Sequence, residues 1–253
     1  MNELSPSMGL KEAIEERRAA RSFRLDPIPT EILTEIFSLG VRSPSGFNLQ
    51  PWRFIVVQEE ANKEKLRACA FDQRQVTEAP VVLICCGDSR VNQTDYIESV
   101  IQIGKNAGGV NDAYADIMRS SIPQLFEYHP SFQSTEAWTN RHTMLAVAHL
   151  MIVAKSFGID TCPMEGFVSA QVKEAFNIPA EVDVCCLLPM GYAAEPCLDA
   201  VAHGGNHGSR SWGGPPRPRC LPKTALHRFK LYGGRFDIEQ VYYGESFGES
   251  FQV

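Results

Sequence analysis

Hydrophobic residues recur along the chain with two spacings, one typical of helices and the other typical of strands. Apolar residues one helical turn apart, as at Leu10 and Ile14, indicate amphipathic helices. Short continuous apolar runs, as from Ala79 to Cys86, indicate buried strands. Helices are therefore predicted over residues 10–18, 30–41, 61–70, 112–128, 136–157 and 170–176, and strands over residues 54–57, 79–86, 160–163, 184–190 and 238–243.

Polar and turn-forming residues refine this pattern. Thr30 and Ser169 are candidate N-caps, because a hydroxyl can accept a hydrogen bond from an amide of the first helical turn. Residues 43–51 contain prolines and a glycine and are predicted to form a loop. The chain lacks both a regular alternation of strands and helices and the G-x-G-x-x-G turn of a dinucleotide-binding fold. The pattern predicts a single α+β domain over residues 1–253.

Composition narrows the class of protein. Of the 253 residues, 44% are hydrophobic and 21% are charged, which excludes wholesale disorder, collagen and coiled coil. Thirty acidic residues against 24 basic ones give a net charge of −6. A surface that binds nucleic acid or anionic lipid throughout would need the opposite balance. We therefore expect neither nucleic acid nor a membrane as a partner.

The cysteine pattern predicts free thiols. Eight cysteines are present without any C-x-x-C spacing, so a zinc or other metal site is not expected. The pairs Cys85-Cys86 and Cys185-Cys186 lie inside apolar runs and are predicted to be small core residues. Free buried thiols favour a reducing compartment, and residues 1–18 do not resemble a secretory signal. The expected location is the cytoplasm.

Four short motifs carry a family resemblance. They are Glu16-Arg-Arg-Ala-Ala-Arg-Ser-Phe23 followed by Pro27-Ile-Pro29, the segment from Ser43 to Trp52, Pro163-Met-Glu-Gly-Phe167, and Arg235. In this order and with this internal spacing, they resemble the FMN-dependent nitroreductase family, from about Leu10 to Tyr192 and again from Gly233. The resemblance implies an α+β, nitroreductase-like fold, in which helices surround a central, mostly antiparallel sheet.

The resemblance assigns arginines to the flavin phosphate. A phosphate of roughly two negative charges accepts charge-assisted hydrogen bonds from guanidinium groups. The implied phosphate-binding residues are Arg17, Arg18, Ala19 through its backbone, Arg21 and Arg235. Solvated arginines at the C-terminal end of a helix, where cations are favoured, are the alternative for the first three arginines. Ala19 replaces the usual Ser of the family and Gly233 replaces a Lys, so this chain lacks one hydroxyl and one charge there.

Other motifs are implied to contact the flavin ring. Small residues of the loop would lie along the flavin edge, namely Ser45, Gly46 and Asn48. In the family, this loop reaches the flavin across a dimer interface. The alternative is that these residues form a capped surface turn. The amides of Gln73 and Gln75 would face the flavin pyrimidine. The segment nearest the flavin N5 would be Pro163, Met164, Glu165 and Gly166, of which Glu165 and Gly166 act through their backbone.

Several aromatic residues and one histidine allow two interpretations. Trp52 is predicted to lie in the core. His142 occupies a frequent Gln position of the family, or is simply a satisfied or exposed helical side chain. Residues 90–135 are expected to form a variable segment that covers the flavin. Its aromatic residues either stack on a flat substrate or pack internally: Phe126, Tyr128 and Phe132.

The implied function is an FMN-dependent NAD(P)H oxidoreductase. It would take electrons from NADH or NADPH, reduce nitroaromatic or quinone-type acceptors by ping-pong hydride transfer, and act as a homodimer. No nucleophile–base pair is present, and none is needed when the cofactor carries the electrons. The alternatives are other reactions of the family, namely reductive dehalogenation, enoate reduction or flavin fragmentation, and a non-enzymatic binding protein.

A Gly/Pro-rich basic insertion at about residues 197–231 departs most from the family pattern. Residues 200–236 hold seven Lys or Arg and no acidic residue. Such a composition buries little apolar surface, so an exposed, mobile loop without a role in the flavin site is expected. In the alternative, one of these cations replaces the charge missing at Gly233, the candidates being Arg210, Arg217 and Lys223.

Overall fold

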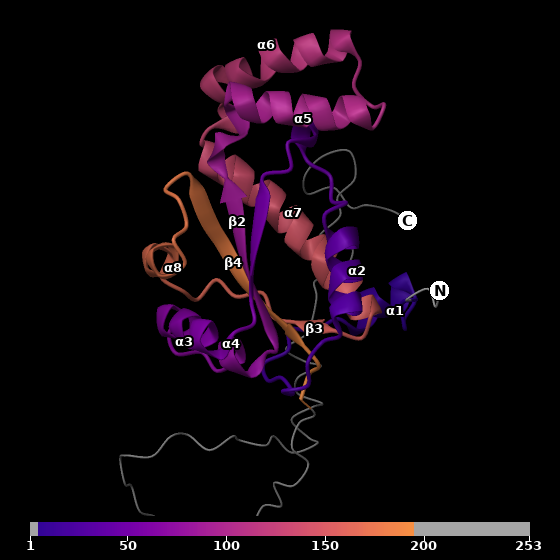
Figure 1. Ribbon diagram of the computed structural model, residues 1–253, viewed down its shortest axis with the longest axis vertical. Helices are drawn as coiled ribbons and strands as arrows, with labels where there is room; N and C mark the ends of the chain where they lie inside the picture. The colour runs from indigo at the N-terminus through magenta and orange to yellow at the C-terminus, as the bar shows by residue number, and fades with distance from the viewer. Residues whose placement is uncertain (1–4, 195–253) are drawn as a thin grey trace, which may run out of the picture. The chain divides into compact units, whose positions relative to one another are not determined.

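A four-stranded antiparallel sheet organises residues 5–194, the part of the chain that the computed structural model describes (Figure 1). Its strands lie in the order β1-β2-β4-β3, and each neighbouring pair is antiparallel. Their bounds are β1 (Trp52–Val57), β2 (Val81–Asp88), β3 (Asp160–Thr161) and β4 (Val182–Gly191). The predicted α+β fold with a mostly antiparallel sheet is confirmed.

The central strand β2 is buried at every residue. Its side chains alternate between two cores: Ile84 and Cys86 face one, whereas Leu83 and Cys85 face the other. Cys85 lies opposite Phe54 on one side and Cys186 on the other, and a bulge separates Cys85 from Cys86. A strand covered on both faces requires a continuous apolar run, which is the pattern that the sequence has here.

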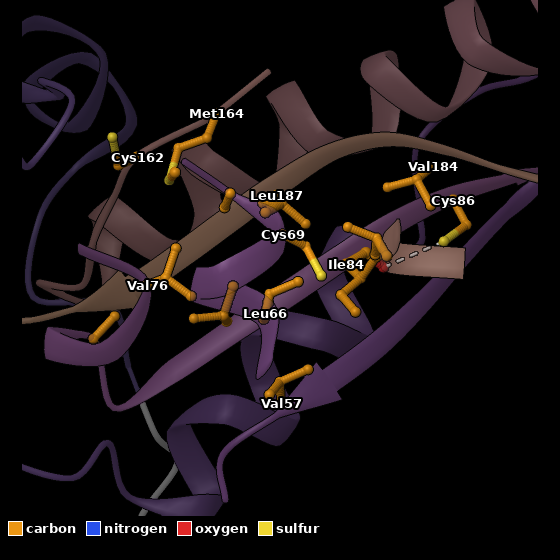
Figure 2. Packing of buried hydrophobic residues seen from close by; sticks show 14 of the residues in the cluster. Val57, Leu66, Cys69, Val76, Ile84, Cys86, Cys162, Met164, Val184 and Leu187 are labelled. Carbon is orange, nitrogen blue, oxygen red and sulfur yellow. Dashed lines mark hydrogen bonds between the residues drawn. The ribbon is translucent and has the colours of Figure 1, made fainter. Parts of the chain in front are cut away.

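Helices cover both faces of the sheet (Figure 1). The long helix α7 (Thr135–Ser156) packs on one face with α2 (Thr30–Gly40), and α1 (Leu10–Glu16) lies beside α7. The other face is covered by α3 (Glu60–Cys69), α4 (Gln75–Glu78) and α8 (Ser169–Ala175). Figure 2 shows this second core, where Leu66 and Val76 pack near Ile84 and Leu187.

A helix pair extends beyond the sheet. It consists of α5 (Thr94–Asn106) and α6 (Asp112–Tyr128), which share a third core with the start of α7. Three short 3-10 turns complete the described elements: η1 (Gly46–Asn48), η2 (Ser89–Asn92) and η3 (Pro130–Phe132).

Several expectations about local structure require correction. Thr30 and Ser169 are not N-caps: each is the first helical residue, after Pro29 and Val168, and neither helix has a side-chain cap. Helix α5 was not predicted, although its apolar residues Ile97, Val100 and Ile101 have helical spacing and are buried. The predicted strand at residues 238–243, the insertion at 197–231 and the domain boundary at residue 253 lie outside the described residues.

The cysteine and tryptophan predictions are confirmed. Cys85, Cys86, Cys185 and Cys186 are free and buried, and Trp52 is 5% exposed. Burial is the main cause that raises the pKa values of Cys86 and Cys185 to about 12, so these thiols stay protonated near neutral pH.

Within residues 5–194, no helix is long and apolar enough to cross a membrane, and no group of His, Cys, Asp or Glu could hold a metal ion.

Candidate functional site

The arginine-containing segment after α1 runs beside β3. The Ala20 amide donates a 3.1 Å hydrogen bond to the Thr161 carbonyl, and Ala19 forms a parallel bridge with Thr161. A few residues later, Glu78 of α4 accepts hydrogen bonds from the Ser22 hydroxyl at 2.9 Å and from the Phe23 amide at 3.3 Å. The segment is therefore fixed between the end of α4 and the edge of the sheet.

The three arginines of this segment differ in their contacts. Arg18 donates from Nη1 to the carbonyls of Glu15 at 2.7 Å and Arg17 at 2.8 Å, which agrees with the helix-closing alternative for this residue. Arg17 is partly buried and Arg21 is exposed. Neither guanidinium has a hydrogen-bond or ion-pair partner within residues 5–194. Arg235 lies outside the described residues.

The segment Pro163–Gly166 is anchored on β4 by its backbone. Met164 is buried and exchanges two hydrogen bonds with Leu187, at 2.8 and 2.9 Å. Just before it, the Cys162 amide donates to the Pro189 carbonyl. Burial raises the pKa of Cys162, and the charge of nearby Arg21 opposes this effect. The Pro163–Gly166 segment therefore continues directly from β3, which pairs with the arginine-containing segment.

Gln73 and Gln75 complete this cluster. The Gln73 amide donates a 2.8 Å hydrogen bond to the Gly166 carbonyl, and the Gln75 amide donates to Gln73 Oε1 at 3.2 Å. A Cβ at residue 166 would lie only 2.8 Å from Gln73 Nε2, so glycine is needed for this close approach. Three predicted segments, Arg17–Arg21, Gln73–Gln75 and Pro163–Gly166, thus meet at one edge of the sheet.

Thr161 joins this cluster without having been predicted. Its side chain is 1% exposed, and its hydroxyl has no hydrogen-bond partner in the described part of the chain. A buried hydroxyl without a partner is unfavourable unless a ligand or water satisfies it. No sequence signal marked this residue, because a single threonine in a short strand is ordinary.

The loop with Ser45, Gly46 and Asn48 lies elsewhere. Gly46 packs on Trp138, in the first turn of α7, whose ring would lie 3.0 Å from an added Cβ. Thr161 instead follows the C-terminal end of α7. Trp138 and Ser156, near the two ends of α7, are about 27 Å apart along the helix at 1.5 Å per residue. Within this chain, the loop and the arginine cluster therefore lie toward opposite ends of α7.

The loop itself has an unusual backbone. Phe47, Asn48 and Gln50 adopt left-handed conformations, with φ values of 50°, 55° and 45°. Ser45 Oγ accepts a 2.9 Å hydrogen bond from the Gln50 amide. The hydroxyl of Ser43 is buried and has no hydrogen-bond partner among residues 5–194.

The remaining aromatic candidates mainly pack internally. Phe126 is buried against Trp138, and Phe132 stacks on the same indole. His142 stacks on Trp138 at 3.8 Å, and its Nδ1 lies 2.9 Å from the Trp138 carbonyl, which supports the structural interpretation of His142. Tyr128 differs, since it is exposed and lines a hollow of about 550 Å³ between α6 and Phe47.

The comparisons with known proteins agree with this architecture. Residues 14–192 match the Nitroreductase family. A Thermus thermophilus protein named NADH dehydrogenase is 32% identical over 190 residues, covering 75% of this chain and 89% of the relative. A Bacillus subtilis protein assigned as the NAD(P)H nitroreductase MhqN is 34% identical over 182 residues, covering 70% of this chain and 85% of the relative.

A solved structure shows the same fold. It is a protein from Exiguobacterium sibiricum, assigned as a nitroreductase and crystallised in complex with FMN. The TM-score is 0.68 and the sequence identity 26%, with 87% of this chain and 97% of the other covered. The α+β fold, the family match and the named relatives together show that this chain is an oxidoreductase. The chain belongs to the Nitroreductase family.

The residues at the site fit a phosphorylated flavin. Arg17 and Arg21 supply unpaired cations for a phosphate. The buried hydroxyl of Thr161, beside the same segment, lacks the partner that a phosphate or ribityl oxygen would provide. Gly166 lets the Gln73 side-chain amide approach its backbone closely, which holds two of the segments implied in ring binding together.

Proposed function

We propose that this protein binds FMN and uses NADH or NADPH to reduce nitroaromatic or quinone-type acceptors. The observation that carries the proposal is the Gln73–Gly166 hydrogen bond, which joins two predicted flavin-binding segments beside unpaired Arg17 and Arg21. The FMN complex of the Exiguobacterium sibiricum relative supports it. The free cysteines suit a reducing compartment, so we place the protein in the cytoplasm.

The phosphate end of the site would be formed by the segment after α1. Arg17 and Arg21 would bind the phosphate through guanidinium groups, and the backbone of Ala19 would contribute a donor. Arg18 would have to leave the carbonyls that it now contacts. Arg235, which lies outside the described residues, would add a further cation.

The ring end of the site would be formed by Gln73, Gln75 and the segment Pro163–Gly166. When bound, FMN supplies the two-electron chemistry that transfers hydride from nicotinamide to acceptor. Gln73 keeps the Gly166 carbonyl turned toward its own amide, and Gln75 fixes the orientation of Gln73. Met164 is fixed on β4 by two backbone hydrogen bonds, and the next residue, Glu165, is exposed.

A homodimer would complete the site. The loop with Ser45, Gly46 and Asn48 lies at the opposite end of α7 from the arginine cluster, so only a second copy could bring its loop to this cluster. Exposed apolar residues on the helices beside α7 and on α7 itself could be covered by such a copy: Leu10, Ile14, Val41 and Leu145.

The visible spectrum of the purified protein tests the proposal. A flavin spectrum that persists on gel filtration, and that NADH or NADPH bleaches without oxygen, is the expected result. Addition of a quinone or nitroaromatic should then restore the colour, with parallel double-reciprocal lines in steady-state assays. Bleaching without reoxidation by these acceptors would favour another reaction of the family. If the protein is incubated with FMN and then elutes from gel filtration without a flavin spectrum, flavin binding is overturned.

A further inference from the structure

Tyr96, on α5, reaches the strained loop that precedes β1. Its hydroxyl lies 2.9 Å from the Leu49 carbonyl and 3.1 Å from the Gln50 carbonyl, so one proton is shared between two adjacent acceptors. Tyr96 is separated from Leu49 by 47 positions in the sequence. The contact therefore ties the helix pair α5–α6 to the loop.

Arg53, on β1, contacts the same part of the loop. Its Nη1 donates to the Gln50 carbonyl at 3.1 Å and to the Trp52 carbonyl at 2.8 Å. Its Nη2 donates to the Tyr96 hydroxyl at 3.1 Å, and the guanidinium lies 5.5 Å from the centre of the Tyr96 ring. The Gln50 carbonyl thus receives hydrogen bonds from both side chains.

Asp88 anchors this arrangement in the sheet. Its carboxylate is fully buried at the end of β2 and lies 3.3 Å from Arg53 Nη2. Arg90 donates two side-chain hydrogen bonds to the same carboxylate, at 2.9 and 2.8 Å. The Asp88 amide donates to the Pro51 carbonyl at 2.8 Å. Side chain and backbone of Asp88 therefore both fix the end of the loop.

The loop needs such support because its backbone is strained. Phe47, Asn48 and Gln50 are left-handed without being glycine, and such residues persist where the surrounding contacts determine them. Tyr96 and Arg53 support the loop through its backbone carbonyls. The exposed Asn48 side chain has no hydrogen-bond partner among residues 5–194. The Asn48 side chain therefore remains available for binding.

We propose that Tyr96 and Arg53, anchored on Asp88, are positioning residues that hold the Ser45–Gln50 loop in its flavin-binding conformation. This inference rests on the proposed function, since it assigns a purpose to the loop geometry. Loss of the clamp would allow the loop to relax from its left-handed backbone. FMN would then have to reorder the loop when it binds, which weakens its apparent affinity.

The first test measures FMN binding by fluorescence quenching. Tyr96→Phe keeps the ring and removes only the hydroxyl, and we expect its dissociation constant to rise about tenfold. Tyr114→Phe is the matched control, because Tyr114 lies on α6 and its hydroxyl has no partner within residues 5–194. Turnover of Tyr96→Phe at saturating FMN should return to the wild-type value. An unchanged dissociation constant, with normal FMN binding by the wild type, would overturn the clamp and leave the proposed function standing.

A second test does not depend on FMN. Hydrogen exchange of the flavin-free protein reports the order of the loop, and the Asn48 and Gln50 amides should exchange about tenfold faster in Tyr96→Phe and in Arg53→Lys. Exchange in β2 should stay at the wild-type rate, which separates loosening of the loop from general destabilisation. Wild-type exchange at both loop amides would overturn the clamp. Failure of the wild type to bind FMN would instead overturn the proposed function and the role assigned to the loop.

Discussion

The side-chain amide of Gln73 donates a 2.8 Å hydrogen bond to the carbonyl of Gly166, across 93 positions of sequence. The same nitrogen lies where it would meet a Cβ on residue 166. The identity of residue 166 therefore controls where the Gln73 amide lies, and the two residues can be tested as one unit.

Gly166→Ala should weaken FMN binding about tenfold with little loss of stability. The added methyl displaces only the flexible end of Gln73, so the fold can adapt, but the hydrogen bond to residue 166 is lost. Titration with FMN and thermal unfolding measure the two effects. Gly109→Ala is the control, since an added Cβ there meets nothing closer than 3.9 Å. If Gly166→Ala binds FMN as the wild type does, this contact has no role in the site.

Arg21→Ala should lose about 1.5–3 kcal/mol of FMN binding free energy, because a charge-assisted hydrogen bond to phosphate is removed. Equilibrium dialysis with FMN and with riboflavin, which lacks the phosphate, measures the effect. Only FMN binding should weaken. Arg119→Ala removes a cation that is paired with Glu98 and Asp116 on α5 and α6, and it should leave both affinities unchanged. Equal weakening for both ligands would place Arg21 outside the phosphate site.

Mixed dimers should recover flavin binding that two separate variants have lost. If Arg21 of one protomer and Asn48 of its partner form one site, then each variant, Arg21→Ala or Asn48→Ala, damages both sites of its homodimer. Coexpression produces heterodimers in which one site carries both substitutions and the other carries none. The flavin content of isolated heterodimers should therefore exceed that of either variant alone. Heterodimers as poor in flavin as their parents would show that both residues serve the same protomer's site.

Asp88 should make the folded state sensitive to acid. Although burial acts to raise its pKa, the hydrogen bonds from Arg90 and the charges of Arg53 and Arg90 together hold the pKa of Asp88 below its ordinary value. The unfolded chain regains a pKa of about 3.9. The stabilisation is thus complete above that pH and is lost as the pH falls through the lower folded pKa.

Asp88→Asn should cost about 1–3 kcal/mol of unfolding free energy at neutral pH, because it removes the buried charge that pairs with Arg53 and Arg90. The cost stays moderate because both arginines are half-exposed and can regain water. Its stability should then fall less steeply than that of the wild type below about pH 4. Denaturant unfolding at several pH values measures both effects. Asp116→Asn, at an exposed ion pair, is the control and should follow the wild type. A parallel pH dependence in Asp88→Asn would refute the assignment.

Local signals allowed most of the fold to be predicted from the sequence. The bounds of α6 are those expected, 112–128, because Asn111 caps its start by accepting from the Tyr114 amide. The predicted strand at 79–86 lies within two residues of β2 at each end, because an apolar run flanked by turn residues is hard to mistake. Helix α5 was missed although its buried residues Ile97, Val100 and Ile101 have helical spacing, because residues 90–135 were expected only as a variable segment over the flavin.

The candidate site was only partly accessible from the sequence. The segments around Arg21 and Gly166 carry local motifs, so each was found by itself. Thr161 and Tyr96 were missed because the importance of a hydroxyl depends on its neighbours in space, and those of Tyr96 are 46 and 47 positions away. Sequence spacing also did not show that Asn48 and Arg21 lie toward opposite ends of α7.

The central position of β2 also determines when this unit can fold during synthesis. Its residues pair with residues of β4 that come 94 to 109 positions later in the chain. Phe23, near the start of the chain, likewise pairs with Ala193. Until β4 emerges, β2 has no neighbour on one edge, and until α7 emerges it also lacks that helix on one face. Such long-range pairing slows folding and exposes a strand prone to aggregation. The nascent chain is therefore most vulnerable on the ribosome between completion of β2 and emergence of β4.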